Sequence, residues 1–168
     1  MDVKKLIEKL GLIPLPGEGG YYKSNFRSPD LINDAVLPDN CAAAKQLYSA
    51  IYYLLTPDTY SAMHRLPTDE IFHFYLGDPV KMLQLYPDGD SSINILGSDI
   101  FAGQLVQCLV PKFTWQGSML IEGGKFALMG TTMSPAYENS DLELADHNIL
   151  SKKYKRHNHL INQLKTHK

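Results

Sequence analysis

The sequence predicts an all-β fold, a sandwich or barrel of short strands, and three observations support this. From Tyr21 to about Thr132, short runs rich in Tyr, Phe, Ile, Val and Leu recur at near-regular spacing. Turn-forming residues separate the runs, as in "TPD" at 56–58 and "PDGD" at 87–90. Helix-period patterns are nearly absent from this stretch, which argues against an α/β fold. The expected strands cover residues 21–28, 47–55, 60–66, 69–76, 80–86, 91–96, 105–110, 114–121 and 125–133.

The N-terminal segment, residues 1–20, is expected to form a helix followed by an arm. Asp2 can cap the helix and Gly11 can end it, and the apolar residues between them recur at helical spacing: Val3, Leu6, Ile7 and Leu10. The stretch "LIPLPGEGG" (12–20) has too many prolines and glycines for long regular structure. We expect it to wrap the mouth of the barrel or to cross to a second subunit.

The C-terminal tail, residues 141–168, differs from the strand region because it is rich in Lys, His and Asn. Its apolar residues allow one or two surface helices: Leu150, Tyr154, Leu160, Ile161 and Leu164. The basic cluster from Lys152 to Arg156 lacks flanking aromatic positions on which bases could stack, so we interpret it as a solvated helix face. No linker divides the chain, and residues 1–168 are expected to form one domain.

Composition and charge restrict the function classes. The 168 residues are 44% hydrophobic and 20% charged, which is typical of a folded domain. A formal net charge of −2 gives no reason to expect nucleic acid or an anionic membrane as a partner. The N-terminus lacks a cleavable apolar core, and no apolar run approaches the roughly 20 residues of a membrane span, so a cytoplasmic protein is expected. Cys41 and Cys108 have no CxxC spacing and are expected to be reduced, buried thiols.

Polar residues interrupt the aromatic strands in "AMHRLPTDEIFHFYLGD" (62–78). Alternation places Glu70 on the same face as Phe72 and Phe74, and the short "LPTD" connection predicts that the strands before and after it are hairpin neighbours. His64 and Glu70 would then point into one space. A carboxylate among Phe side chains needs a partner, and a His can both satisfy it and exchange protons with it. The pair is either an acid–base site or a structural contact that orients two strands.

Several motifs, in order, resemble the cupin superfamily and in particular its uncharacterised branch, cupin family 5. They are "PLPGEGGYY", "HRLPTDEIFHF", "VPKFTWQ" and "DLELAD". The resemblance covers about residues 10–150. It implies a double-stranded β-helix, the cupin jelly-roll barrel, over residues 21–133, with short N- and C-terminal helices. It also implies a ligand pocket inside the barrel, a homodimer, and kinship with nucleotide-sugar epimerases and sugar-phosphate isomerases.

The chain departs from the metal-binding cupin pattern. His64 and Glu70 stand at two ligand positions of the family, but Leu66 occupies the second His position and Gln116 the His position of the second motif. Leu cannot coordinate a metal, and an amide oxygen is a poor ligand for Zn or Fe. His64, Glu70 and Gln116 could hold a divalent metal only weakly, with His73 joining them if a bulge turned it inward.

A barrel without a tight metal would still offer a pocket for a small-molecule ligand. Tyr52, Gln107 and Gln116 are candidates to hydrogen-bond a polyol, although only one of Tyr52 and Tyr53 can face inward. The remaining candidates could pack on a ligand or simply belong to the core or to an outer face: Phe72, Phe74, Trp115 and His73. Glu18 and Tyr22 are expected at the pocket entrance.

The sequence therefore predicts a cupin that binds a small polar metabolite, a sugar or nucleotide-sugar derivative. If it is an enzyme, isomerisation or epimerisation by proton transfer through His64 and Glu70 is the expected chemistry. Two alternatives remain: a non-catalytic binding or sensing cupin, and a weakly metal-dependent cupin enzyme.

Overall fold

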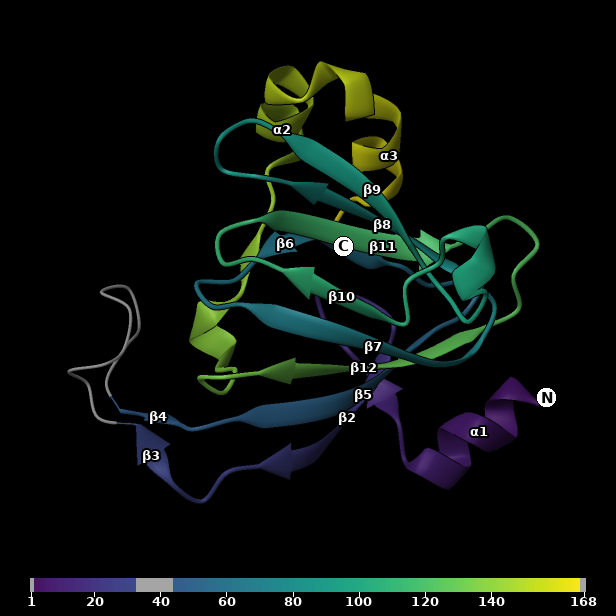
Figure 1. Ribbon diagram of the computed structural model, residues 1–168, viewed down its shortest axis with the longest axis vertical. Helices are drawn as coiled ribbons and strands as arrows, with labels where there is room; N and C mark the ends of the chain where they lie inside the picture. The colour runs from purple at the N-terminus through teal and green to yellow at the C-terminus, as the bar shows by residue number, and fades with distance from the viewer. Residues whose placement is uncertain (1, 33–43, 167–168) are drawn as a thin grey trace.

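Two antiparallel sheets face each other in the computed structural model, which describes residues 2–32 and 44–166. The six-stranded sheet has the order β1-β2-β5-β12-β7-β10, and the five-stranded sheet has the order β13-β6-β11-β8-β9. A small two-stranded sheet, β3-β4, extends from the first. Figure 1 shows the six-stranded sheet below and the five-stranded sheet above, so the architecture is the expected cupin jelly roll.

The long strands lie within a residue or two of their predicted bounds. They are β2 (Tyr21–Arg27), β5 (Ser49–Leu55), β6 (Ser61–Arg65), β7 (Glu70–Gly77), β8 (Val80–Leu85), β9 (Ser91–Leu96), β10 (Gln107–Val110), β11 (Trp115–Leu120) and β12 (Ala127–Met133). Sequence patterns missed four strands of two residues each, which are too short to show alternation: β1 (Ile13–Pro14), β3 (Leu31–Ile32), β4 (Lys45–Gln46) and β13 (Glu143–Leu144).

The strands before and after "LPTD" are not hairpin neighbours, which corrects one prediction. β6 pairs with β11 and β13, whereas β7 pairs with β10 and β12 in the opposite sheet. The connection at 66–69 therefore crosses between the sheets. His64 and Glu70 still line one cavity, because both point inward from facing walls of the barrel. The turn predicted at "PDGD" (87–90) is confirmed, since this segment joins the paired strands β8 and β9.

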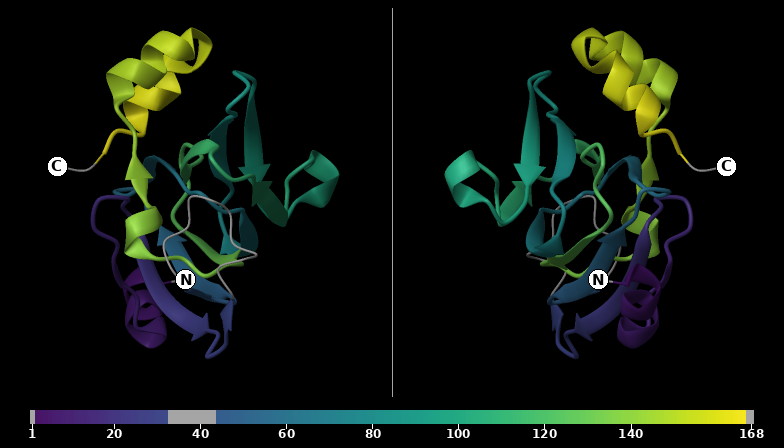
Figure 2. Two further views of the ribbon diagram at one scale, coloured as in Figure 1. Left: turned by 90° about the vertical axis from the view of Figure 1, so that its left-hand side faces the viewer. Right: turned by 90° about the vertical axis from the view of Figure 1, so that its right-hand side faces the viewer.

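Helices cover the outside of both sheets. The first helix, α1 (Val3–Leu10), begins at the predicted Asp2 cap, whose carboxylate accepts the backbone N–H groups of Lys4 and Lys5, and it ends at Gly11. Helices α2 (His147–Lys153) and α3 (Asn158–Gln163) lie over the five-stranded sheet, at the other end of the molecule from α1 (Figures 1 and 2). They form the predicted helical tail. Short 3-10 helices complete the described structure: Ile100–Ala102, Asn139–Asp141 and Lys155–His157.

The tail helices bury an apolar stripe against the outer face of the five-stranded sheet. Leu150, Tyr154, Ile161 and Leu164 contact Met63 of β6 and the outward residues of β8. Residues at the basic cluster alternate with this stripe and are exposed, as the solvated-face interpretation predicts. Among the described residues, none of the helices is long and apolar enough to cross a membrane.

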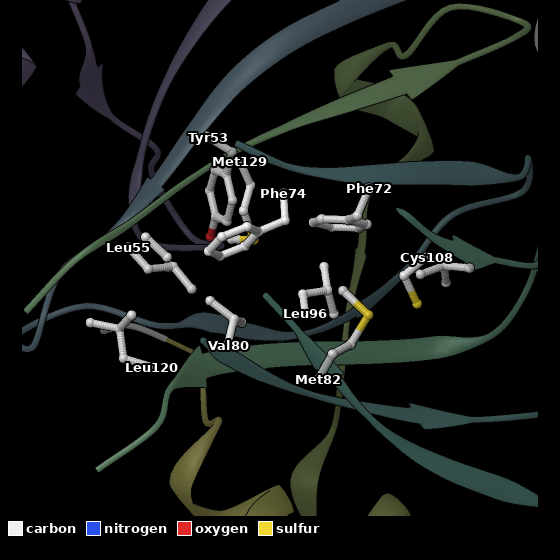
Figure 3. Close-up of a cluster of buried hydrophobic side chains, with 12 residues drawn as sticks. Tyr53, Leu55, Phe72, Phe74, Val80, Met82, Leu96, Cys108, Leu120 and Met129 are labelled. Atoms are coloured by element: carbon white, nitrogen blue, oxygen red, sulfur yellow. The ribbon is translucent and has the colours of Figure 1, made fainter. Parts of the chain in front are cut away.

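The interior of the barrel is divided into an apolar half and a polar half. Figure 3 shows Phe72 and Phe74 of β7 facing Val80 and Met82 of β8, in a cluster that closes one end of the barrel. Cys108 is a free, buried thiol beside this cluster, while Cys41 lies outside the described residues. Beyond this cluster, mainly polar side chains from β2, β5, β6, β7 and β12 surround a cavity. The apolar half thus supplies a rigid floor for the polar half.

We predict that Gly77→Ala destabilises the protein more than Gly89→Ala, although both glycines have positive φ angles of 107° and 97°. At Gly77 a Cβ would lie 2.3 Å from the Phe126 carbonyl oxygen, whereas nothing lies within 4 Å at Gly89. Backbone strain alone should cost about 1–3 kcal/mol, and only Gly77→Ala adds a steric clash to it. Urea unfolding of both variants measures the difference, and equal losses of stability would contradict the packing described at Gly77.

Candidate functional site

A cavity of about 190 Å³ occupies the polar half of the barrel. Its walls come from β2, β5, β6, β7 and β12, from the N-terminal arm, and from the segment that follows β12. The lining residues are Leu15, Glu18, Tyr22, Ser24, Arg27, Ser49, Ile51, Tyr53, His64, Leu66, Glu70, Phe72, Thr131, Met133, Tyr137 and Asn139. Pockets for drug-sized ligands hold about 300–1,000 Å³, so this cavity suits a single small ring or a short chain.

A β-bulge in β6 sets the position of His64. The register between β6 and β11 shifts between Gln116, opposite His64, and Ser118, opposite Ser61, so β6 carries one extra residue. Gly117 lies across from the bulge, where a Cβ would be 2.8 Å from the Met63 sulfur. Glycine on the facing strand therefore leaves room for the Met63 side chain beside the bulge.

The backbone groups around the bulge are satisfied by segments from both ends of the chain. The Ala62 N–H donates to the Glu18 carbonyl oxygen at 2.7 Å, and the Met63 N–H donates to the Leu164 carbonyl oxygen at 2.9 Å. The N-terminal arm is consequently attached inside the site, while the tail helices are attached outside it. Buried backbone groups need such partners, so arm, bulge and tail depend on one another.

The arm delivers Glu18 to the cavity. Besides the backbone bond to β6, the Glu18 carboxylate accepts the Ser61 hydroxyl at 3.1 Å. The Tyr53 hydroxyl donates to the Gly19 carbonyl oxygen at 2.9 Å, which holds the end of the arm against β5. Gly20 has a φ of 74°, and a Cβ there would meet the Tyr53 hydroxyl at 2.8 Å. The arm thus closes the barrel mouth of its own chain, one of the two alternatives that the sequence left open.

His64 presents one ring nitrogen to the cavity. Its Nδ1 lies 2.8 Å from the Ala62 carbonyl oxygen, which can only accept, so Nδ1 carries a proton. In the neutral ring, Nε2 then holds the lone pair. Within residues 2–32 and 44–166, Nε2 has no hydrogen-bond partner, and the nearest charged atom is Glu18 Oε1 at 3.9 Å. A buried imidazole nitrogen that is free to accept a proton is a candidate general base.

Glu70 is held on the opposite wall as a candidate acid. Its Oε2 accepts the Gln116 amide N–H at 2.6 Å, and the Thr131 hydroxyl also bonds its carboxylate. Burial is the main reason that the pKa of Glu70 is raised above its ordinary value of 4.5, and repulsion from Glu18 adds to the rise. The charge of His64 and the two hydrogen bonds oppose the shift. A raised pKa favours the protonated carboxyl, which can donate.

Tyrosines line the remainder of the polar wall as neutral hydroxyl groups. Burial, followed by repulsion from Glu18, raises the pKa of Tyr137 to about 12. The same two causes raise the pKa of Tyr53 well above 10.0. Both hydroxyls therefore remain protonated near neutral pH. The Tyr53 hydroxyl donates its hydrogen bond to the arm, at the Gly19 carbonyl oxygen. Tyr137 lines the cavity from the segment after β12.

An arginine at the cavity lining is already paired. The Arg27 guanidinium bonds the carboxylate of Glu138 and the side-chain oxygen of Gln46. A buried ion pair between Lys45 and Asp141 holds the neighbouring segment, which carries Tyr137 and Asn139 into the wall. The positive charge at this edge is thus matched by acidic partners.

Three of the predicted site residues line the cavity, and a fourth lies directly behind it. His64, Glu70 and Phe72 face the space, and Gln116 is buried against Glu70. The partner expected for His64 was Glu70, but the acid nearest to its Nε2 is Glu18. Glu18 and Tyr22 line the cavity, as their expected place at its entrance implies.

Two predicted ligand contacts, Tyr52 and Trp115, face away from the cavity because neighbouring residues of a strand point to opposite sides. Tyr53 lines the cavity, so Tyr52 faces outward, where its ring meets the Tyr75 ring edge-on at 6.0 Å. Gln116 points inward, so Trp115 lies outside under the Arg65 guanidinium at 4.6 Å. Choosing Tyr52 instead of Tyr53 was therefore wrong, and assigning both Trp115 and Gln116 to the pocket was not compatible with a strand.

Three further candidates also lie outside the cavity. His73 and Gln107 lie on the outer face of the six-stranded sheet, and Phe74 lies in the core. His73 bonds the Thr132 hydroxyl at 3.1 Å and the Gln107 amide at 3.1 Å on the outer face. No bulge turns His73 inward. Phe74 belongs to the apolar cluster below the cavity floor.

The residues present do not fit a tightly held metal ion. Leu66 lines the cavity at the family's second His position, and Gln116 directs its N–H group, not its oxygen, at the neighbouring carboxylate. Among the described residues, no three His, Cys, Asp or Glu side chains lie close enough together to hold a metal. His64, Glu70 and Gln116 therefore form a hydrogen-bonding wall, and no step of the chemistry proposed below depends on a metal.

Tyr53, Thr131 and Tyr137 were missed as site residues. Alternation could have suggested Tyr53, because Leu55 on the same face continues into the core. Nothing in the local pattern could identify Thr131 or Tyr137. Their places depend on which strand lies beside Glu70 and on the path of the chain after β12.

Comparison with known proteins gives the same fold. Residues 4–145 match the family described as Cupin superfamily (DUF985). An uncharacterized yeast protein, YML079W of Saccharomyces cerevisiae, is 27% identical over 133 residues, which cover 74% of this chain and 66% of that protein, just under two thirds of its length.

Two solved structures are similar over nearly their whole lengths. A hypothetical protein from Leishmania major has a TM-score of 0.89 and 26% identity, with 99% of this chain and 100% of that chain covered. Protein SO0799 from Shewanella oneidensis has a TM-score of 0.84 and 33% identity, with 98% of each chain covered. Neither name states a ligand or an activity.

We predict that Glu70→Gln stabilises the protein at pH 7 but not at acidic pH. The raised folded pKa means that the unfolded state loses the Glu70 proton first as pH rises above about 4.5. The free energy of unfolding of the wild type should therefore fall as the pH rises from about 4.5 to the pKa of Glu70 in the folded protein. The variant has no carboxyl at this position and should not show this fall. Thermal unfolding from pH 4 to pH 8 measures the difference in Tm, and a difference that does not change with pH would rule out the raised pKa.

Proposed function

This chain belongs to the cupin superfamily, in the branch described as DUF985, and from that premise we propose that its barrel binds a small polar, sugar-like metabolite. We further propose that His64 and Glu70 transfer protons on this ligand, as in an isomerase or epimerase. One observation carries the proposal. A buried imidazole nitrogen without a hydrogen-bond partner among the described residues, and a buried carboxyl with a raised pKa, line the same enclosed cavity.

The cavity walls suit a hydroxylated ring. Ser24, Ser49, Thr131 and Asn139 offer hydrogen-bonding groups, while Phe72 offers an apolar face. A nucleotide would exceed the volume of about 190 Å³, so only the sugar-sized part of a nucleotide sugar fits inside. The ligand of this proposal is therefore a monosaccharide or a molecule of similar size.

Proton transfer next to a carbonyl group follows from the two side chains. His64 Nε2 removes the proton from the carbon beside the carbonyl, and the protonated Glu70 carboxyl gives its proton to the carbonyl oxygen. An enol forms, and Glu70 becomes a carboxylate while His64 becomes an imidazolium. When the carbon that lost its proton also bears a hydroxyl, the enol is an enediol: His64 gives its proton to the former carbonyl carbon while Glu70 takes the proton of the neighbouring hydroxyl, which moves the carbonyl by one carbon and restores both groups.

A non-catalytic binding or sensing cupin is the alternative. The same walls would orient a ligand without proton transfer, and His64 Nε2 would accept a ligand hydroxyl. The two functions differ in what the acid–base pair does after binding. Ligand turnover therefore separates them, whereas binding alone does not.

We predict that His64→Ala and Glu70→Gln each lower turnover by at least about 100-fold, the usual contribution of a general acid or base. Thermal shift first finds a ligand among monosaccharides and their oxidised and phosphorylated forms, because a ligand of the folded state raises Tm. Isomer formation is then followed by NMR. His73→Ala is the matched control, since His73 lies on the outer face and its loss should leave turnover unchanged.

Retained turnover in the His64 and Glu70 variants would remove their assigned roles. Binding with no product in the wild type would favour the sensing alternative. If no compound raised Tm, the cavity would not be the site of a sugar-like ligand.

We also propose that the outer face of β7 and β10 contacts a second copy of the chain. Ile71, Tyr75 and Leu109 are 39%, 49% and 51% exposed there, beside the side chains of His73 and Gln107. β10 is the edge strand of its sheet, and a largely apolar face can pack against the same face of a second copy. This face suits the homodimer that the family resemblance implies.

We predict that Ile71→Asp combined with Leu109→Asp converts a dimer to a monomer, because the two substitutions place like charges across the symmetric contact. Light scattering after size exclusion measures the mass. Ile149→Asp is the control, since Ile149 is 64% exposed on α2, over the other sheet. A wild-type monomer, or a variant that remains a dimer, would contradict the assigned face.

A further inference from the structure

We propose that the cavity selects a ligand with a protonated amine, of the amino-sugar class, and that Glu18 of the N-terminal arm binds this amine. The inference rests on the proposed function, because it takes the same cavity as the ligand site. It adds the charge of the ligand and a binding residue contributed by the arm.

The charge of the cavity favours a cation. Glu18 and Glu70 both line it, and His64 is the only unpaired basic side chain among its described lining residues. Arg27 also lines the cavity, but Glu138 matches its charge. When His64 and Glu70 share one acidic proton, Glu18, Glu70 and His64 together carry a net charge of −1. This sum is the same whether the proton is on His64 or on Glu70. A cationic ligand would neutralise this charge.

Buried acceptors in the cavity wall have hydrogen-bonding capacity that the described chain does not use. His64 is buried, yet its Nε2 faces the cavity without a hydrogen-bond partner in the described ranges. The Glu18 carboxylate accepts a single hydrogen bond among the same residues, from the Ser61 hydroxyl. A buried polar group without a partner is costly, so a ligand that donates hydrogen bonds gains from meeting these acceptors. An ammonium group has three donors and no acceptor, which suits a wall of acceptors.

Glu18 is fixed in place before any ligand arrives. Its backbone oxygen is bonded to β6, its carboxylate accepts the Ser61 hydroxyl, and its side chain is 15% exposed. The Tyr53 bond to Gly19 holds the next residue of the arm. Because the Glu18 carboxylate is already held in place, binding a cation costs little conformational entropy. For the same reason, the carboxylate cannot move away from a bound anion.

The same charges disfavour phosphate inside the cavity. A phosphate group would lie near two carboxyl side chains in a poorly solvated space, where like charges repel strongly. The guanidinium that could compensate is engaged with Glu138 and Gln46. A neutral hexose should therefore bind with intermediate affinity, between the amine and the phosphate.

Matched hexoses test the inference by isothermal titration calorimetry at pH 7, with EDTA present to exclude metals. Glucose, galactose and mannose are each compared with the 2-amino-2-deoxy sugar and the 6-phosphate. At least one amino sugar is expected to bind about tenfold more tightly than its neutral parent, as a charge-assisted hydrogen bond provides, and the phosphates more weakly than either. The proteins are the wild type, Glu18→Gln, and the control Glu8→Gln, since Glu8 is exposed on α1.

Glu18→Gln should lose the preference for the amine while keeping the affinity for the neutral hexose, and Glu8→Gln should keep both. Retention of the neutral hexose shows that the variant is folded. Neutral or phosphorylated hexoses that bind as tightly as the amines would overturn the inference and leave the proposed function standing. An undiminished preference in Glu18→Gln would overturn the role of Glu18. No binding by any of the hexoses would overturn both proposals.

Discussion

The one-residue bulge in β6 is the constraint on which the candidate site depends. It places Ala62 and Met63 opposite a single glycine, so their backbone N–H groups must find partners outside the sheet ladder. The N-terminal arm supplies one partner at Glu18, and the C-terminal tail supplies the other at Leu164. The bulge therefore joins the two ends of the chain to the strand that carries the candidate base. Without the bulge, the arm would lose the hydrogen bond from the Ala62 N–H that holds Glu18 in the barrel mouth.

The barrel supports the site by separating apolar from polar contacts along the same strands. On β7, Glu70 and Phe72 face the cavity, and Phe74, two residues further on, belongs to the core. A period of two residues keeps all three on the inner face, so their order along the strand sets the depth of each side chain. The close-packed aromatic floor excludes water from below, and burial then raises the pKa of the carboxyl above it. Burial therefore both stabilises the barrel and raises the pKa of Glu70.

The departure from the metal-binding cupin pattern changes what the inner wall can do. Where that pattern places imidazoles, this chain places Leu66 and Gln116, and the amide of Gln116 donates to Glu70. The wall then presents acceptors and one exchangeable proton instead of a set of metal ligands. Glu18, which comes from the arm and not from a strand, adds a second carboxyl. The chemistry proposed for the cavity follows from this combination of groups.

The sequence by itself determined the nine long strands, the ends of the first helix and the inward direction of His64, Glu70 and Phe72, because period and turn chemistry are local properties. It could not determine which strands pair. The short connection at 66–69 was therefore taken for a hairpin, although it crosses between sheets. Only the tertiary structure decided that Glu18 lies nearest to His64. That proximity arises from a bulge and from backbone bonds between segments about 45 residues apart, and no local pattern records such bonds.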